Sequence, residues 1–178
     1  MHNRVASFIT GNPAAAAAAA VALGGALTIL GAYVFQYGFG LPPCPLCLEQ
    51  RIPYYVAIPL ALVVAKAAQQ RVPRPWVVGG LGLLVLAMLI GAGLGVYHAG
   101  VEWKWWAGPQ DCSGPLDPLG TRDLLQQLQT VSIVRCDEAA WRFLGLSLAG
   151  YNVLISLLLA AIAAWGIAAS LPRKLPGS

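Results

Sequence analysis

Charged residues are scarce in this chain. They make up 10% of its 178 residues, while 58% belong to the hydrophobic set, and a soluble domain carries about a quarter charged residues. Histidine is scarcer still, because it occurs only at His2 and His98. The shortage of charge argues against a soluble globular protein, and the shortage of histidine leaves no histidine-rich cluster for a metal centre.

Four apolar runs stand out, and they approach or exceed the roughly 20 residues that a helix needs to cross a bilayer. Lipid offers the backbone no hydrogen-bond partner, so a spanning segment has to satisfy its own backbone as a helix. The sequence therefore predicts an all-α integral membrane protein, a four-transmembrane-helix bundle that forms one domain over residues 1–178. The predicted spans are residues 14–37, 52–68, 76–97 and 143–171, with one long loop at 98–142.

The first predicted span begins with an alanine tract, Ala14 to Ala20, of a kind also found in the apolar region of signal peptides. The run continues without a charge for more than 20 residues and no polar cleavage region follows it, which favours a retained span. Glycines recur in the third run, and no strand precedes them. We therefore expect them to make close helix contacts rather than a phosphate-binding loop.

Basic residues near the ends of the spans set the expected orientation. Four spans place both termini and the link "QQRVPRP" on one side, with six cations in short flanks. The other side has five cations spread over a longer sequence, together with all seven acidic residues. We expect both termini in the cytoplasm of a bacterial inner membrane and the long loop in the periplasm. Juxtamembrane cations explain the net charge of +4, so this charge does not indicate nucleic-acid binding.

All four cysteines fall on the predicted outer side, with Cys44 and Cys47 in a short turn and Cys112 and Cys136 in the long loop. In an oxidising compartment two disulfides are the default expectation. The Cys-x-x-Cys pair would be a weak staple, because a bond across two residues removes little entropy from the unfolded chain. A zinc site made of all four cysteines stays an alternative, although only one pair has the close spacing of a zinc knuckle.

The surroundings of the Cys-x-x-Cys pair indicate redox chemistry. Prolines before and within the motif predict that the second helix begins at or just after Cys47. A thiol at that point meets the positive end of the helix dipole, and Arg51, four residues on, adds a permanent charge on the same face. Both would lower the pKa of Cys47. His98, where the third span meets the long loop, is either a polar interface residue or a neighbour of a redox cofactor.

Two segments of the long loop indicate contact with the membrane surface. The stretch "GVEWKWWAGP" places three tryptophans beside the third span, and indole rings favour the headgroup region. The stretch "TRDLLQQLQTVSIV" has Thr121 as a helix cap and leucines at helical spacing, which predicts a short amphipathic helix lying on the membrane. This helix would hold Cys112 and Cys136 near the Cys-x-x-Cys pair.

In combination these features resemble the bacterial disulfide bond formation protein B (DsbB) family. The resemblance rests on four spans, "CPLCLEQR" opening the second, a cysteine pair between the third and fourth, and "CDEAAWRFLGLSLAGYN" leading into the fourth. It implies an enzyme, a protein-disulfide oxidoreductase that uses ubiquinone or menaquinone. Its partner would be a periplasmic thioredoxin-fold dithiol oxidase of the DsbA type.

The resemblance also implies roles for particular residues. Cys112 would form the mixed disulfide with the partner protein, and Cys136 would be its mate in the loop. Cys44 would exchange disulfides with the loop pair. Cys47 would face the quinone as a thiolate, and Arg51 would stabilise both that thiolate and the quinone oxygen.

Some features leave other interpretations open. His98 matches a histidine that the family places near the quinone, whereas Glu49 could temper the positive field at Cys47. The vitamin K epoxide reductase family also couples a loop cysteine pair to a quinone-facing Cys-x-x-Cys, but there the loop cysteines precede the motif and here they follow it. A non-enzymatic membrane protein with loops held by disulfides or zinc is the remaining alternative.

Overall fold

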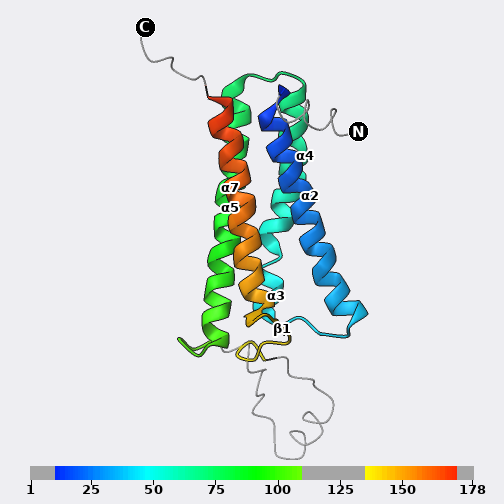
Figure 1. The fold of residues 1–178 in the computed structure, drawn as a ribbon, viewed down its shortest axis with the longest axis vertical. Coiled ribbons are helices and arrows are strands. Elements are labelled where there is room, and N and C mark those ends of the chain that lie inside the picture. The colour runs from blue at the N-terminus through cyan, green and yellow to red at the C-terminus, as the bar shows by residue number, and fades with distance from the viewer. Residues whose placement is uncertain (1–10, 110–134, 172–178) are drawn as a thin grey trace, which may run out of the picture.

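Four long helices make up most of this computed structural model, which describes residues 11–109 and 135–171 (Figure 1). They are α2 (Pro13–Tyr33), α4 (Ile52–Gln69), α5 (Arg74–Glu102) and α7 (Leu148–Ser170). The shorter elements are the π-helix η1 (Val34–Gly38), helix α3 (Pro45–Glu49) and the strands β1 (Arg142–Phe143) and β2 (Leu146–Ser147). Four helical segments are long and apolar enough to cross a membrane, which confirms the predicted all-α, four-helix membrane fold. The predicted amphipathic helix after Thr121 lies outside the described residues.

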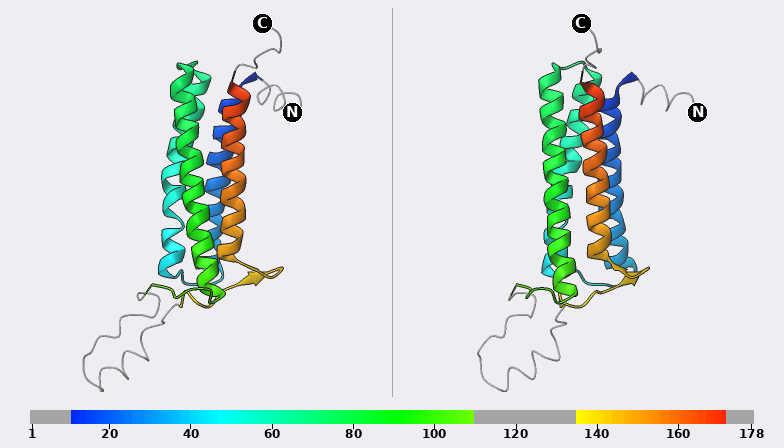
Figure 2. Two further views of the ribbon diagram at one scale, coloured as in Figure 1. Left: turned by 90° about the vertical axis from the view of Figure 1, so that its left-hand side faces the viewer. Right: turned by 60° about the vertical axis from the view of Figure 1, so that its left-hand side comes forward.

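The long helices form a ring in which each packs mainly on two neighbours. Helix α2 packs on α4 and α7, and α5 packs on the same two helices (Figure 2). Small residues fill much of the interior, while large apolar side chains point outward. Examples are the buried Ala15, Ala61 and Ala163 and the exposed Leu23, Leu83 and Leu157. An interior of small residues inside an apolar exterior suits a bundle surrounded by lipid.

Close contact between α5 and α7 depends on Gly95. A Cβ atom placed there would lie 2.8 Å from the Val153 side chain, which is closer than real Cβ atoms approach, and 3.2 Å from the backbone oxygen of Ala149. The prediction of close helix contacts is confirmed at this position. It does not hold for every glycine of α5, because a Cβ would meet nothing within 4 Å at Gly79, Gly82 and Gly93.

A small hairpin precedes α7, although the apolar run that begins at Phe143 predicted helix there. The two residues between the strands have positive φ, 48° at Leu144 and 83° at Gly145, which is the conformation of a two-residue type I′ turn. The chain therefore reverses before the helix starts. Ser147 then caps α7, because its hydroxyl accepts a hydrogen bond from the backbone N–H of Gly150 at 3.2 Å.

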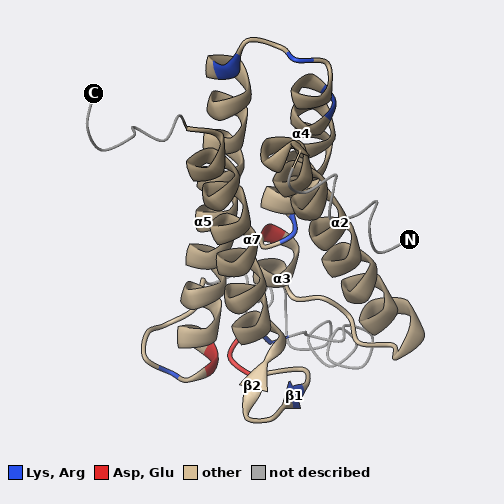
Figure 3. Cartoon of the chain, turned by 45° about the horizontal axis from the view of Figure 1, so that its top comes forward, with Lys and Arg blue, Asp and Glu red and all other residues tan. Residues whose placement is uncertain are grey.

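Charged residues concentrate at the two ends of the bundle (Figure 3). The start of α2, the link from α4 to α5 and the end of α7 share one end, and α3 and the hairpin lie at the other (Figure 1). The cations near the first end are Lys66, Arg71 and Arg74. Every acidic residue of the described part of the chain belongs to the second end: Glu49, Glu102, Asp137 and Glu138. The second end also carries Arg51, Lys104, Arg135 and Arg142. Among the described residues the two ends therefore differ in their acidic residues, and the orientation stays a prediction.

Candidate active site

The Cys-x-x-Cys pair lies at the start of helix α3. Cys44 is the N-cap residue, and its Sγ accepts a hydrogen bond from the backbone N–H of Cys47 at 3.2 Å. The two Sγ atoms are 2.6 Å apart, and both cysteines are free. The helix begins at Pro45, earlier than predicted, because proline is favoured in the first turn, where its missing N–H costs nothing. The sulfur at the helix end is therefore that of Cys44.

Cys136 packs against this pair. It is fully buried in a cluster with Cys44, Leu46 and Val101, and Cys47 lies at the edge of that cluster. Cys136 is disulfide-bonded. The structure thus brings three of the four predicted catalytic cysteines together, and the fourth, Cys112, lies outside the described residues. A disulfide sulfur is not a thiolate ligand, so in this state Cys136 cannot contribute to the four-cysteine zinc site considered as an alternative.

The environment of Cys44 favours the thiol over the thiolate. The pKa of Cys44 is raised above its ordinary value, first by the side-chain hydrogen bond with Cys47 and then by burial. The backbone N–H of Cys47 acts in the opposite direction. Because the raising influences dominate, a thiolate at Cys44 would need further hydrogen-bond donors to stabilise it.

His98 of α5 lies next to this sulfur. Its Nε2 lies 3.6 Å from the Sγ of Cys44 and 3.8 Å from Oε1 of Glu102, one helical turn away. Its Nδ1 lies 2.6 Å from Nε2 of Gln50. The imidazole is 4% exposed, so its hydrogen bonds are made within the protein. The structure therefore brings His98 to the cysteine pair, and its predicted place beside a redox cofactor stays a prediction.

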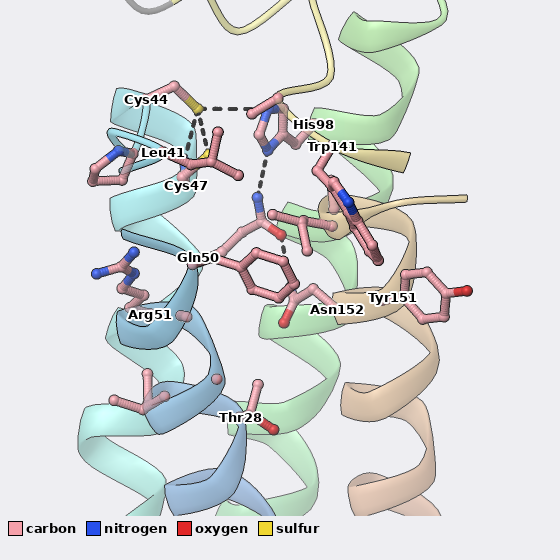
Figure 4. A pocket seen from close by; sticks show the side chains of 18 of the residues that line it. Thr28, Leu41, Cys44, Cys47, Gln50, Arg51, His98, Trp141, Tyr151 and Asn152 are labelled. Carbon is pink, nitrogen blue, oxygen red and sulfur yellow. Dashed lines mark hydrogen bonds between the residues drawn. The ribbon is translucent and has the colours of Figure 1, made fainter. Parts of the chain in front are cut away.

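A chain of polar side chains continues from His98 into the bundle (Figure 4). Gln50 Oε1 accepts from Asn152 Nδ2 at 2.8 Å, and Asn152 Oδ1 accepts from the Tyr54 hydroxyl at 2.8 Å. The Tyr54 hydroxyl also lies 2.7 Å from that of Ser156. These residues come from α4, α7 and the junction between α3 and α4. Together with His98 and Cys44 they form the polar network of the site.

Arg51 lies on the other side of Gln50 from His98 in this view (Figure 4). It stands at the break between α3 and α4 and donates a hydrogen bond from Nη1 to Gln36 Oε1 at 2.8 Å. Its guanidinium carbon lies 5.3 Å from the centre of the Tyr33 ring, which is within cation–π range. Gln36 and Tyr33 thus hold the guanidinium, and Arg51 lines the same cavity as Cys44 and Cys47.

A cavity of about 540 Å³ connects these groups. Its polar end is lined by Cys47, Arg51 and His98, and apolar residues of α2 and α7, such as Leu27 and Ile155, line the rest. A guanidinium carries five N–H donors and no acceptor, so Arg51 suits a carbonyl oxygen. Donors at one end and apolar walls elsewhere fit the ring and tail of a membrane quinone.

Comparisons with known proteins identify the family of this chain. The family model described as "Disulfide bond formation protein DsbB" matches residues 14–166. The chain belongs to that family. It is 30% identical to "Disulfide bond formation protein B" of Polaromonas sp., over 77% of this chain and 80% of that one. The protein of the same description from Verminephrobacter eiseniae is 32% identical, over 80% and 81%. An uncharacterized protein of Rickettsia prowazekii is 28% identical, over 72% and 73%. No solved structure matches the chain.

Sequence reasoning missed most of the polar network. The missed residues have buried or partly buried side chains at the site, and they are Gln50, Tyr54, Glu102, Asn152 and Ser156. A signal was present, because polar residues inside a membrane span are costly and usually functional. Asn152 and Ser156 are four residues apart in an apolar run, a spacing that puts both on one face of a helix.

Proposed function

We propose that the chain is a membrane thiol:quinone oxidoreductase. It reoxidises a periplasmic thioredoxin-fold dithiol oxidase of the DsbA type and passes the electrons to ubiquinone or menaquinone, which sustains disulfide bond formation. One observation carries the proposal: Cys44 and Cys47 stand at the polar end of an apolar cavity, and the disulfide-bonded Cys136 packs against Cys44. A loop disulfide and a cavity for a lipid-soluble acceptor thus meet at one dithiol.

Redox energetics call for an acceptor of this kind. A DsbA-type oxidase has a potential near −120 mV, whereas a thioredoxin-like pair has one near −270 mV. Driving the oxidation of the former with the latter would be uphill by about 150 mV, or roughly 7 kcal/mol for two electrons. A stronger terminal oxidant is therefore required. When bound, a quinone supplies a two-electron, two-proton acceptor.

The cysteines carry the exchange steps. A partner thiolate attacks the Cys112–Cys136 disulfide at Cys112, and the second partner thiol resolves the mixed disulfide, which leaves the loop pair reduced. Cys136 then attacks an oxidised Cys44–Cys47 pair at Cys44, and Cys47 leaves as a thiolate. Attack by Cys112 on Cys136 restores the loop disulfide and leaves Cys44 and Cys47 reduced. Two electrons have then moved from the partner to the inner pair, and no atom is gained or lost.

Other side chains hold and polarise the site. Arg51, fixed by Gln36, stabilises negative charge on Cys47 and on the carbonyl oxygen of a bound quinone. His98 lies beside Cys44, with its Nε2 at 3.6 Å from the sulfur. For a soluble partner to reach the loop, the end of the bundle that carries the cysteines faces the periplasm and both termini face the cytoplasm of a bacterial inner membrane.

Turnover of the purified protein tests this function. Full-length protein in detergent is mixed with a reduced DsbA-type partner and a short-chain ubiquinone or menaquinone, and quinone absorbance is followed. We expect quinone to be consumed and Cys47→Ser to abolish its consumption. Arg51→Lys should raise the KM for quinone, because a lysine replaces the planar guanidinium with a single point charge. Arg74→Lys, at the opposite end of the bundle, is the matched control.

Two results would contradict the proposal. Unchanged turnover in Cys47→Ser would remove the inner pair from the reaction. Cysteines that resist mild reduction and alkylation, with and without quinone, would instead favour structural disulfides. Trapping the redox state of the thiols in the same samples distinguishes these cases.

A further inference from the structure

A backbone carbonyl fixes the orientation of the Asn152 amide. Its Nδ2 lies 3.2 Å from the carbonyl oxygen of Gly91, and a carbonyl can only accept a hydrogen bond. The nitrogen, not the oxygen, of Asn152 therefore faces Gly91. The same NH₂ group donates to Gln50 Oε1 at 2.8 Å, while the amide oxygen of Asn152 accepts from Tyr54.

The orientation of Asn152 fixes that of Gln50. With Oε1 of Gln50 directed at a donor, its NH₂ group must point the other way, toward the carbonyl oxygen of Leu46 at 3.3 Å and Nδ1 of His98 at 2.6 Å. The Leu46 carbonyl is again an acceptor only. Two independent backbone oxygens thus give the same result, that Gln50 donates to His98 and Nδ1 of His98 accepts.

A neutral imidazole that accepts at Nδ1 carries its proton on Nε2. That nitrogen faces the sulfur of Cys44 at 3.6 Å and a carboxylate oxygen of Glu102 at 3.8 Å. His98 also makes a hydrogen bond with the backbone of Cys136. The sulfur of Cys44 and the oxygen of Glu102 can accept a hydrogen bond, and both lie nearest to Nε2 of the ring.

We propose that Gln50, held by Asn152, is a positioning residue that keeps His98 in the Nε2–H tautomer, so that His98 donates a hydrogen bond to the sulfur of Cys44. The inference rests on the proposed function only for the use made of that sulfur. A donor stabilises a thiolate more than a thiol, which helps Cys44 to leave or attack as a thiolate in a buried place. His98 then acts by hydrogen bonding to Cys44 and not as a base that removes its proton.

The charges around the site are compatible with this role. Cys47 of α3 and Cys136, which precedes β1, pack against Cys44. Glu102 of α5 stands beside His98 and within electrostatic reach of Cys47 and of Arg142 of β1. One carboxylate oxygen of Glu102 is buried without a hydrogen-bond partner among the described residues. An acceptor oxygen close to Nε2 favours a proton on that nitrogen.

Nitrogen NMR tests the tautomer directly. The chain has only two histidines, so ¹⁵N-histidine labelling of the full-length, reduced protein in detergent gives two imidazoles, and His2→Asn assigns them. Protonated and unprotonated ring nitrogens have well-separated ¹⁵N chemical shifts. We expect unprotonated Nδ1 and protonated Nε2 at His98. In Gln50→Glu a carboxylate faces Nδ1, so we expect Nδ1 to become protonated. Gln69→Glu, exposed near the far end of α4, should leave His98 unchanged.

A functional measurement accompanies the spectrum. Gln50→Met removes the donor to Nδ1, and the pH at which turnover reaches half its maximum should move upward by roughly 0.5 to 1 unit, the worth of one hydrogen bond to the Cys44 thiolate. A protonated Nδ1 in the wild-type protein, or an unchanged His98 spectrum in Gln50→Glu, would overturn the inference. Quinone turnover by the wild-type protein distinguishes failure of this inference from failure of the proposed function. Turnover together with a proton on Nδ1 would overturn the tautomer and leave the function standing.

Discussion

Removing the Tyr54 hydroxyl tests the polar network as a stabilising element. Tyr54 is 1% exposed, donates to Asn152 at 2.8 Å and lies 2.7 Å from the Ser156 hydroxyl. Tyr54→Phe keeps the packed ring and deletes both hydrogen bonds. Interhelical hydrogen bonds in membrane proteins average about 0.6 kcal/mol and reach about 1.7 kcal/mol. We therefore expect the free energy of unfolding to fall by about 1 to 3 kcal/mol.

Reversible unfolding by sodium dodecyl sulfate in mixed micelles measures this change. Tyr37→Phe is the control, because Tyr37 is 75% exposed beyond the end of α2. A double-mutant cycle with Ser156→Ala should give a coupling of about 0.6 kcal/mol, since the two hydroxyls share one hydrogen bond. A loss in Tyr54→Phe no larger than that in Tyr37→Phe would refute the reasoning, and so would additive effects of the two changes.

Two further predictions concern helix packing and pH. Gly95→Ala should lower the free energy of unfolding by about 1 to 3 kcal/mol, because the new Cβ meets Val153 at 2.8 Å in a packed contact. Gly93→Ala, with nothing within 4 Å, should change it by under about 1 kcal/mol; equal losses in the two variants would contradict the packing. The pKa of Cys44 is raised from 9.0 in the folded protein, so above about pH 9 only the unfolded state loses this proton and stability falls, by up to about 1.4 kcal/mol per pH unit. Reduced Cys44→Ala should lack that decline, and identical pH profiles of unfolding would argue against the raised pKa.

Much of the fold could be predicted from composition and run length. Lipid leaves the backbone no alternative to the helix, so apolar runs locate the four helices. The first and last residues of the helices were harder to predict, because the same apolar residues occur in helices and in hairpins. Phe143 begins an apolar run, yet the left-handed backbone at Leu144 and Gly145 makes a turn before α7. The start of α3 was also predicted wrongly. We expected the prolines to put the helix start at or just after Cys47, but Pro45 is the first residue of the helix.

The candidate site also has residues that the sequence indicated and residues that it did not. Cysteine chemistry and the charge of Arg51 are local features, so the sequence pointed to them, and the structure brings Cys44, Cys47, Arg51 and His98 to one cavity. The partners of His98 could not be predicted, because Asn152 is 102 residues from Gln50 in sequence. Which polar side chains pair across a bundle depends on how the helices are rotated against one another, and apolar runs do not specify that rotation.

The polar network links the packing of the bundle to the chemistry at its end. Polar groups in a membrane interior need internal partners, and here the partners run in sequence from Ser156 and Tyr54 through Asn152 and Gln50 to His98. Each link joins different elements, so a shift of α7 against α4 would also release the Gln50 amide. Because that amide faces the imidazole next to Cys44, the helix contacts that stabilise the bundle also determine which hydrogen bond reaches the sulfur.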